Sequence, residues 1–222
     1  MSAENQMSKT VLKVAGISKR FGGLQALSDV DMTIERGQVY GLIGPNGAGK
    51  TTFFNVITGL YTPDSGTFEL AGKPYQPTAV HEVAQAGIAR TFQNIRLFAE
   101  MTALENVMVG RHVRTSSGLL GAIFRTAKFK QEEAEIAQRA QELLDYVGIG
   151  KYADYRARTL SYGDQRRLEI ARALATDPQL IALDEPAAGM NATEKVQLRE
   201  LIDRIRKDNR TILLIEHDVK LV

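Results

Sequence analysis

Residues 44–51 of this chain read GPNGAGKT, which fits the pattern G-x-x-x-x-G-K-[ST]. At average composition, a chance match somewhere in a chain of this length has a probability of roughly 1%. The context agrees, because Gln38 to Ile43 predicts a short apolar strand before the loop and the residues after it predict a helix to about Leu60. Glycines let successive backbone N–H groups turn toward an anion, and a helix that starts near Lys50 adds its positive dipole end. The stretch therefore predicts a phosphate-binding loop, against the simpler alternative of a glycine turn that caps a helix.

The loop also predicts which phosphates are bound. Lys50 would reach the β- and γ-phosphates of a nucleoside triphosphate, and Thr51 would offer its hydroxyl to Mg²⁺. ATP and Mg²⁺ are therefore the expected ligands. The residues of this segment predicted to contact the nucleotide are Gly44, Pro45, Asn46, Gly47, Ala48, Gly49, Lys50, Thr51 and Thr52.

A second motif, LIALDE at residues 180–185, is an apolar strand that ends in two carboxylates. In open α/β sheets, ligands bind at the carboxyl ends of the strands. Asp184 is then placed to hold Mg²⁺, and Glu185 becomes the candidate general base for the attacking water. By itself the motif could also be a strand followed by an acid that caps a helix, but the phosphate loop favours the catalytic interpretation.

Composition limits the class of protein. The 222 residues suffice for one large α/β domain, and the formal net charge of +2 is too small to suggest nucleic-acid binding by bulk electrostatics. The absence of cysteine excludes disulfides, thiolate catalysis and zinc–thiolate sites. No stretch approaches the roughly 18 to 20 apolar residues of a membrane span, and the polar N-terminus lacks the apolar run of a secretory signal. We therefore expect a soluble chain that meets a membrane only through a partner.

The hydrophobic pattern predicts an α/β core interrupted by helices. Strands are expected between Val11 and Ile34, at 66–70, 87–92, 179–183 and 211–216, and a helix at 193–207. Helical spacing dominates from about 94 to 160. We predict one nucleotide-binding domain over residues 1–222, with its core at about 9–93 and 161–222 and a helical insertion at about 94–160. The expected fold class is a P-loop NTPase core with a mostly parallel sheet, an antiparallel β subdomain and an inserted helical subdomain; Met1 to Ser8 is expected to be a loose tail.

A third motif narrows the family. Residues 160–167 read LSYGDQRR, which resembles the signature motif of the ATP-binding cassette, usually written L-S-G-G-Q. Tyr162 replaces the first glycine and Asp164 replaces the glutamine, whereas Ser161 and Gly163, which are expected to touch phosphate, are retained. A serine that opens a helix forms an anion site. In the family this site reaches the phosphate loop of a second subunit; the plainer alternative is a capped helix.

The resemblance covers nearly the whole chain and implies three further site residues. Phe21 matches an aromatic residue that stacks on adenine, Gln93 the glutamine that senses Mg²⁺ and the attacking water, and His217 the switch histidine that contacts the γ-phosphate. Each also has a simpler interpretation, respectively as a core residue, a loop residue and a strand-end cap.

Two segments resemble the ATPases of branched-chain amino-acid importers and of their urea and amide relatives. They read PAAGMN at 186–191, where the family usually ends in aspartate, and RTFQNIRLF at 90–98. Asn191 is also a good N-cap to which Glu194 could return a hydrogen bond, and both roles can coexist. The chain stops at Val222, five residues after His217, where such ATPases usually continue for some tens of residues, so we expect either a short form or a truncated product.

The resemblance implies the partners and the location. They are a second ATPase subunit, identical or different, transmembrane permease subunits and a substrate-binding protein, with no nucleic acid, and the chain would lie on the cytoplasmic face of the cell membrane. Arg96, Leu97 and Phe98 would line the groove that receives a short permease helix. The segment 111–130 carries five basic and no acidic residues. It would form either a helical hairpin packed on the insertion or a surface toward the permease and its anionic lipids.

Two other functions compete with transport. A soluble, non-transport cassette acting on nucleic acid or ribosomes usually has two cassettes, a coiled-coil insertion or a basic tail, and none is visible. A regulatory module without turnover would not need the base Glu185. The sequence therefore favours a transport ATPase.

Overall fold

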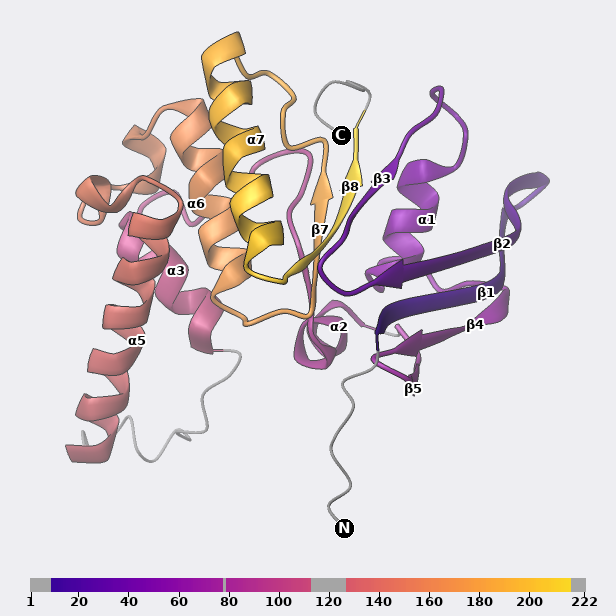
Figure 1. Cartoon of the computed structure of the whole chain (residues 1–222), viewed down its shortest axis with the longest axis horizontal. Coiled ribbons are helices and arrows are strands. Elements are labelled where there is room, and N and C mark those ends of the chain that lie inside the picture. The colour runs from indigo at the N-terminus through magenta and orange to yellow at the C-terminus, as the bar shows by residue number, and fades with distance from the viewer. Residues whose placement is uncertain (1–8, 78, 113–126, 217–222) are drawn as a thin grey trace. The chain divides into compact units, whose positions relative to one another are not determined.

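The computed structural model describes residues 9–77, 79–112 and 127–216 (Figure 1). Contacts divide the chain into two compact units. Unit 1 comprises Met1–Arg90, Gln179–Glu185 and Ile202–Val222; unit 2 comprises Thr91–Pro178 and Pro186–Leu201. Residues 94–160, the predicted helical insertion, belong to unit 2, and so do residues 161–178. The predicted N-terminal tail lies outside the described residues.

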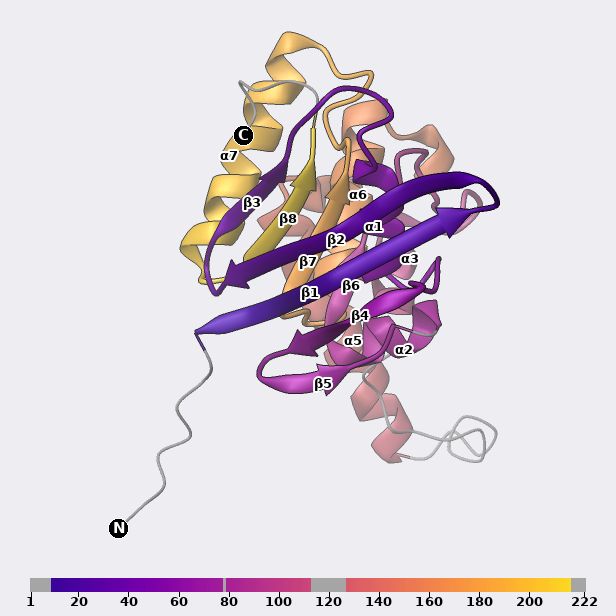
Figure 2. The same cartoon turned by 90° about the vertical axis from the view of Figure 1, so that its right-hand side faces the viewer.

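Unit 1 contains an antiparallel sheet with the strand order β2-β1-β4-β5 (Figure 2). The stretch in which two or three strands were expected forms two long ones that pair as a hairpin, with Phe21 opposite Leu24 at its tip. Along these strands, buried residues recur against exposed ones because one face of the sheet covers the core. The bounds are β1 Thr10–Phe21, β2 Leu24–Glu35, β4 Ser65–Leu70 and β5 Lys73–Tyr75.

The second sheet of unit 1 is parallel, with the order β3-β8-β7-β6 (Figure 2). Every residue of β7 and β8 is buried, which is why both strands read as continuous apolar runs. The bounds are β3 Val39–Leu42, β6 Ile88–Arg90, β7 Leu180–Asp184 and β8 Thr211–Ile215. The phosphate loop follows the carboxyl end of β3, Thr91 follows that of β6, and Glu185 follows that of β7.

Helix α1 (Lys50–Ile57) joins the core of unit 1. Its residues Phe53, Phe54, Val56 and Ile57 belong to one buried cluster with residues of both sheets. This packing anchors the C-terminal half of α1 in the core. It thereby fixes the position of the helix start, which follows the phosphate loop directly. The short helix α2 (Val80–Ala86) precedes β6.

Unit 2 is helical. Helices α3 (Ala103–His112), α5 (Ala127–Tyr146) and α6 (Tyr162–Leu174) pack on one another, with 3₁₀ turns at Gly150–Tyr152 and Ala157–Thr159 (Figure 1). Helix α5 buries an apolar face whose residues recur at helical spacing: Ile136, Ala140, Leu143, Leu144 and, just after the helix, Val147. Helix α7 (Ala192–Lys207) begins in unit 2 and ends in unit 1.

The predicted fold class is confirmed, with an antiparallel sheet, a parallel sheet and a helical unit. Among the described residues, no helix has both the length and the apolar character that crossing a membrane requires. Residues 113–126, most of the basic and apolar segment at 111–130, lie outside the described part of the chain.

Candidate active site

The phosphate loop lies between β3 and α1 in unit 1. Gly49 ends it with a φ of 82°, a left-handed conformation that favours glycine. A Cβ atom on Gly49 would also lie 2.7 Å from the carbonyl oxygen of Ala26, so a side chain is excluded by space as well as by φ. The Lys50 ammonium donates hydrogen bonds to the carbonyls of Gly44 (2.6 Å) and Pro45 (2.8 Å). These contacts hold the charge of Lys50 over its own loop.

A hollow of about 340 Å³ opens over this loop. Glu185 shares its lining with the loop and with the start of β2. The lining residues are Leu24, Gln25, Ala26, Asn46, Gly47, Ala48, Gly49, Lys50, Thr51, Thr52 and Glu185. The hollow thus brings together residues of two predicted motifs, the phosphate loop and the carboxylate pair, which are more than 130 positions apart in the chain.

Glu185 has an unusual backbone. Its φ is 44°, in the left-handed region that a residue with a side chain rarely adopts. Its N–H donates to the carbonyl of Ile215 at 3.0 Å, which ties the residue to the end of β8. Such strain, typically about 1 to 3 kcal/mol, persists where the surrounding structure imposes it and clusters at functional sites. The strained backbone therefore indicates that the surrounding structure holds Glu185 in a specific position, as expected for a functional residue.

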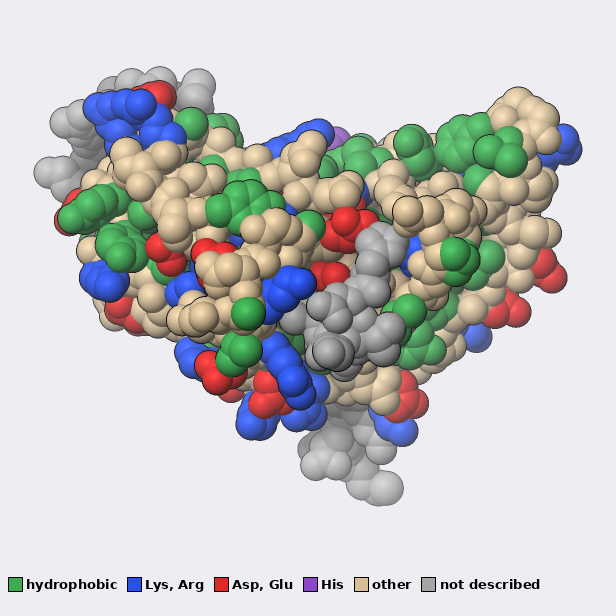
Figure 3. Space-filling view, turned by 90° about the horizontal axis from the view of Figure 1, so that it is seen from above, with side chains coloured by type: hydrophobic (Ala, Val, Ile, Leu, Met, Phe, Trp, Pro, Cys, Tyr) green, Lys and Arg blue, Asp and Glu red, His purple; other side chains and the backbone are tan. Residues whose placement is uncertain are grey.

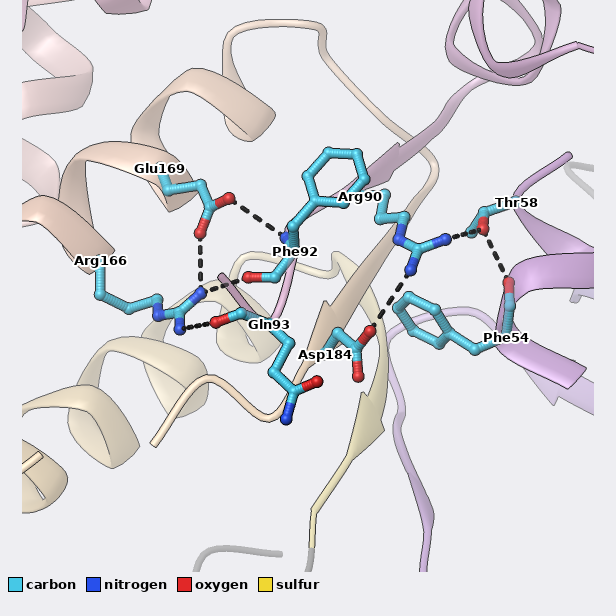
Figure 4. A network of polar contacts seen from close by, with 8 residues as sticks. All are labelled: Phe54, Thr58, Arg90, Phe92, Gln93, Arg166, Glu169 and Asp184. Atoms are coloured by element: carbon cyan, nitrogen blue, oxygen red, sulfur yellow. Dashed lines mark hydrogen bonds and ion pairs between the residues drawn. The ribbon is translucent and has the colours of Figure 1, made fainter. Parts of the chain in front are cut away.

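Asp184 is 5% exposed and lies in a polar network of unit 1 (Figure 4). The Arg90 guanidinium lies 3.3 Å from its carboxylate, donates to the Thr58 hydroxyl at 2.7 Å, and stacks over the Phe54 ring at 4.7 Å. Thr58 in turn donates to the carbonyl of Phe54 at 2.7 Å. The charge of Asp184 is therefore balanced within the fold by Arg90, a residue that the sequence analysis did not single out.

The donor set suits Mg²⁺. Thr51 offers a hydroxyl and Asp184 a carboxylate, both hard oxygen ligands of the kind Mg²⁺ prefers. Mg²⁺ commonly binds to one or two protein oxygens and completes its shell with water and substrate phosphates. Within the described residues, no cluster of three or more acidic, histidine or cysteine side chains forms a self-sufficient metal cage. The residues present therefore fit a metal ion that is held jointly with phosphate.

Phe21 lies at the tip of the β1–β2 hairpin and is 41% exposed, so its ring is not part of the buried core. Its cross-strand partner is Leu24, which lines the hollow over the phosphate loop. The ring meets Tyr61 edge-on, with the centroids 5.2 Å apart, and the Lys19 ammonium lies 5.5 Å from its centroid. The structure therefore leaves Phe21 available for a ligand.

In unit 2, the main chain around Gln93 is held by two buried charges on α6 (Figure 4). Arg166, 0% exposed, donates to the carbonyls of Phe92 (2.6 Å) and Gln93 (2.7 Å). Glu169 accepts a hydrogen bond from the Phe92 N–H at 3.1 Å and pairs with Arg166 at 2.8 Å. Burial raises the pKa of the Glu169 carboxyl, against the lowering effects of the Phe92 N–H and of Arg166. The Gln93 side chain itself is exposed.

The signature motif opens α6. Ser161 is its N-cap, and the Ser161 hydroxyl accepts a hydrogen bond from the Asp164 N–H at 3.2 Å and contacts the Asp164 carboxylate at 2.7 Å. The capped-helix alternative therefore describes this local structure, and the Asp164 side chain lies directly at the helix start. A Cβ atom on Gly163 would lie 2.6 Å from the Glu194 carboxylate, so glycine permits this close approach of α7 to the motif.

Asn191 opens α7 in the way predicted. Its N–H donates to the Glu194 carboxylate at 3.0 Å, and its side-chain oxygen accepts from the Glu194 N–H at 2.9 Å. This reciprocal pair is a capping box, and it confirms the capping role. The exposed position of Asn191 leaves room for a second role.

The loop after Gln93 is also held through its backbone. The side chain of Asn106, fully buried in α3, accepts from the Phe98 N–H at 2.9 Å and donates to the Phe98 carbonyl at 3.1 Å. Arg172 of α6 donates to the Arg96 carbonyl. The Phe98 ring remains 47% exposed. The backbone of this loop is therefore fixed, whereas the exposed Phe98 ring lies at the surface, 5.8 Å from the Arg172 guanidinium.

His217 lies outside the described residues. Sequence reasoning missed Arg90, Arg166, Glu169 and Asn106. The signal available was weak: three charged residues of α6, Arg166, Glu169 and Arg172, recur at three-residue spacing among apolar ones, which marks one helix face without saying that it is buried.

Comparisons with known proteins agree with these motifs. Residues 27–188 match the family described as "ABC transporter". The chain is 48% identical over 217 residues to the high-affinity branched-chain amino acid transport ATP-binding protein BraF of Pseudomonas aeruginosa, covering 97% of this chain and 85% of BraF. It is similar to a crystal structure of the ADP conformation of an ATP-binding cassette of an ABC transporter (TM-score 0.83, 33% identity, 97% and 84% coverage). It is also similar to a cassette described as a dimeric post-hydrolysis state bound to ADP and Pi (TM-score 0.77, 26% identity, 95% and 89% coverage).

Proposed function

The chain belongs to the ABC transporter family, and from that membership we propose that it powers the import of branched-chain amino acids or related small amides. As a member of the family it binds and hydrolyses ATP. The observation that carries the assignment is the hollow over the phosphate loop, which Lys50, Thr51 and Glu185 line together. The kind of solute rests on the similarity to BraF, because a subunit of this type does not touch the solute.

The proposed chemistry assigns one task to each residue. Lys50 meets the negative charge of the β- and γ-phosphates, and Glu185 accepts a proton from the attacking water. Thr51 and Asp184 would hold Mg²⁺, which when bound supplies positive charge to the phosphate oxygens. Gln93 and His217 are proposed to position the water and to contact the γ-phosphate. Phe21 is proposed to stack on adenine.

We further propose that the complete site forms only between two chains. Ser161 and Gly163 of one chain would contact the nucleotide held by the phosphate loop of the other, and Asn191 would act at the same interface. A similar cassette is described as a dimer with ADP and Pi, which supports this arrangement. ATP bound between the chains would favour the closed dimer, and loss of the γ-phosphate would reopen it.

The partners would be a second ATPase subunit, permease subunits and a substrate-binding protein, with the chain on the cytoplasmic face of the membrane. The loop at Arg96, Leu97 and Phe98 would receive the permease. The soluble alternative, a cassette acting on nucleic acid or ribosomes, finds less support. The face shown in Figure 3 intersperses Lys and Arg with Asp and Glu instead of gathering one sign of charge, and BraF is a transport protein.

Hydrolysis can be tested with the purified chain. We expect Mg²⁺-dependent release of phosphate from ATP. Glu185→Gln should still bind ATP, turn over slowly and accumulate closed dimers that gel filtration detects. Hydrolysis by Glu185→Gln at the wild-type rate would show that Glu185 is not the base.

The shared site can be tested by mixing variants. When Ser161→Arg chains meet Lys50→Ala chains, a head-to-tail dimer puts both defects into one site and leaves the other intact, so partial activity should return. When a chain carrying both substitutions meets wild type, each site receives one defect, and such mixed dimers should be inactive. Equal activity of the two mixed dimers would refute action across the interface.

The solute can be tested in cells. Loss of this chain should abolish high-affinity uptake of labelled leucine, isoleucine or valine. Loss of urea or amide uptake instead would keep the ATPase assignment and correct the solute.

A further inference from the structure

The buried contacts of α6 point to a function for residues outside the recognised motifs. On the basis of the function proposed above, we propose that Arg166 and Glu169 are positioning residues that lock the backbone of Gln93 to the helix opened by Ser161. The segment that senses the nucleotide of one chain and the segment that reaches the nucleotide of the other would then move as one body.

The first support is the set of groups to which the Arg166 guanidinium donates hydrogen bonds. Its Nη1 donates to the Phe92 carbonyl (2.6 Å) and to Glu169 (2.8 Å), and its Nη2 donates to the Gln93 carbonyl (2.7 Å) and to the Tyr162 hydroxyl (3.3 Å). All four Nη hydrogens can therefore be used, in the planar fork that only arginine presents. Because Arg166 is 0% exposed, these bonds replace water entirely at the Nη atoms.

The second support is that Arg166 and Glu169 contact residues 92 and 93 through backbone groups. Glu169 accepts from the Phe92 N–H at 3.1 Å and Arg166 donates to the Phe92 carbonyl, so both backbone polar groups of Phe92 are bonded to α6. The carboxamide of Gln93 points away from Arg166 (Figure 4), and the residue is exposed. A buried pair that only filled space would not need to hold the backbone on either side of one exposed, functional side chain.

The third support is that Arg166 is linked, through Tyr162, to the segment that follows Glu185. Arg166 bonds to the hydroxyl of Tyr162, and the Tyr162 ring lies 3.3 Å from the position that a Cβ atom on Gly189 would take. Gly189, with a φ of 76°, belongs to the turn that leads to Asn191. Within unit 2, Arg166 and Tyr162 thus link the segment of Gln93, the helix start at Ser161 and the turn that leads to Asn191.

The residues before and after Thr91 are attached to different units. Arg90, the last residue of this segment in unit 1, is held by Asp184, Thr58 and Phe54 of its own unit. Phe92, two positions on, is held by α6 of unit 2. The change of attachment occurs within two residues, so the backbone of Gln93 is attached to α6, whereas Arg90 is attached to Asp184 at the end of β7.

The test separates positioning from folding. Arg166→Lys keeps the charge but loses the fork. The double variant Arg166→Met/Glu169→Met removes both charges, and well-packed apolar replacement of a buried ion pair often leaves stability unchanged or raised. The control is Arg139→Met, because Arg139 pairs with Glu142 at the same three-residue spacing and 2.9 Å, but on the exposed face of α5. Each variant is examined alone for urea unfolding, ATP affinity and hydrolysis, and in the Glu185→Gln background for the ATP concentration that half-saturates dimer formation.

We expect Arg166→Lys to bind ATP within about twofold of wild type but to lose about tenfold or more in hydrolysis, since small misplacement of a catalytic group has effects of that size. Dimer formation should need about tenfold more ATP for the same reason. The double variant should still fold but should also lose about tenfold or more in hydrolysis. Amide exchange should increase at residues 92–93, because their backbone groups lose the hydrogen bonds to Arg166 and Glu169. Arg139→Met should match wild type in every assay.

Other outcomes would overturn either the positioning role or the proposed function. A double variant that is stable and hydrolyses ATP at the wild-type rate would overturn the positioning role and leave the proposed function intact. Wild-type closure by Arg166→Lys would overturn it as well. A wild-type chain that neither hydrolyses ATP nor lets its Glu185→Gln form dimerise would overturn the proposed function, and the positioning role would fall with it.

Discussion

Removal of the Phe21 ring should weaken ATP binding while leaving the fold nearly intact. The ring is 41% exposed, and its described contacts are an edge-on partner at 5.2 Å and an ammonium at 5.5 Å. An edge-on aromatic pair contributes about 0.5 to 1.5 kcal/mol, so Phe21→Ala should cost about 1 kcal/mol of unfolding free energy. Stacking of an aromatic side chain on a base contributes about 1 to 3 kcal/mol. That loss corresponds to a Kd for ATP raised about 5- to 150-fold.

The absence of tryptophan from this chain provides a direct assay. Phe21→Trp keeps an aromatic face and introduces a single tryptophan, whose selectively excited emission should be quenched when adenine stacks on it. Calorimetry of Phe21→Ala, Phe21→Tyr and wild type gives the affinities, and we expect Phe21→Tyr to match wild type.

A matched control exists in unit 2. Tyr155 is 55% exposed and meets Tyr152 edge-on at 5.4 Å, a geometry close to that of Phe21 and Tyr61. Tyr155→Ala should leave ATP affinity unchanged, and Tyr155→Trp should not respond to ATP. Unchanged affinity of a folded Phe21→Ala chain, or a silent Phe21→Trp chain that binds ATP by calorimetry, would refute the stacking role.

Three further results are expected. Asp164 contacts the Ser161 hydroxyl at 2.7 Å and puts a carboxylate where a phosphate of the partner's ATP is proposed to bind. Asp164→Gln should therefore lower the ATP concentration needed for closure about two- to tenfold, by relief of like-charge repulsion; closure at unchanged or higher ATP would contradict this. Phe98→Glu should leave ATP binding unchanged and uncouple hydrolysis from transport, and normal uptake in cells would count against the docking role of Phe98, whose ring is exposed. Burial raises the pKa of Glu169 above its ordinary 4.5, so the stability linked to its proton is present below that value and lost as the pH rises through the folded pKa. The unfolding free energy of wild type minus that of Glu169→Gln should fall in urea titrations as the pH rises above 4.5, and a rise would show that pairing with Arg166 outweighs burial.

The parts of the fold that were predictable have local causes. The phosphate loop and the buried strands carry their own turn chemistry and apolar runs, and β7 was expected at 179–183 and is found at Leu180–Asp184. Strand β5 and helix α2 were missed because they have only 3 and 7 residues, too few for a period to stand out. The strand order β3-β8-β7-β6 was out of reach for a different reason, since it joins segments far apart in the chain.

The site divides in the same way. Lys50, Thr51 and Glu185 were proposed from motifs, and the structure brings them to one hollow. Arg166 could not be proposed, because arginine is normally exposed and is buried only when its donors are satisfied. Its acceptors are carbonyls 73 and 74 positions away, and the sequence pattern carries no record of a main-chain acceptor.

The division of the chain into two units suggests how hydrolysis could be transmitted. The chain passes between the units at four points, and two of these lie next to proposed catalytic residues. Glu185 is the last residue of its segment in unit 1, and Gln93 is the third residue after the crossing at Arg90. Asp184 pairs with Arg90, and the Glu185 N–H donates to the carbonyl of Ile215 in β8, so both acids are attached to unit 1 directly before the chain enters unit 2 at Pro186. Under the proposed function, loss of the γ-phosphate would change the charge beside residues that are covalently adjacent to unit 2. There, Arg166 bonds the backbone of Phe92 and Gln93 to the helix that Ser161 opens.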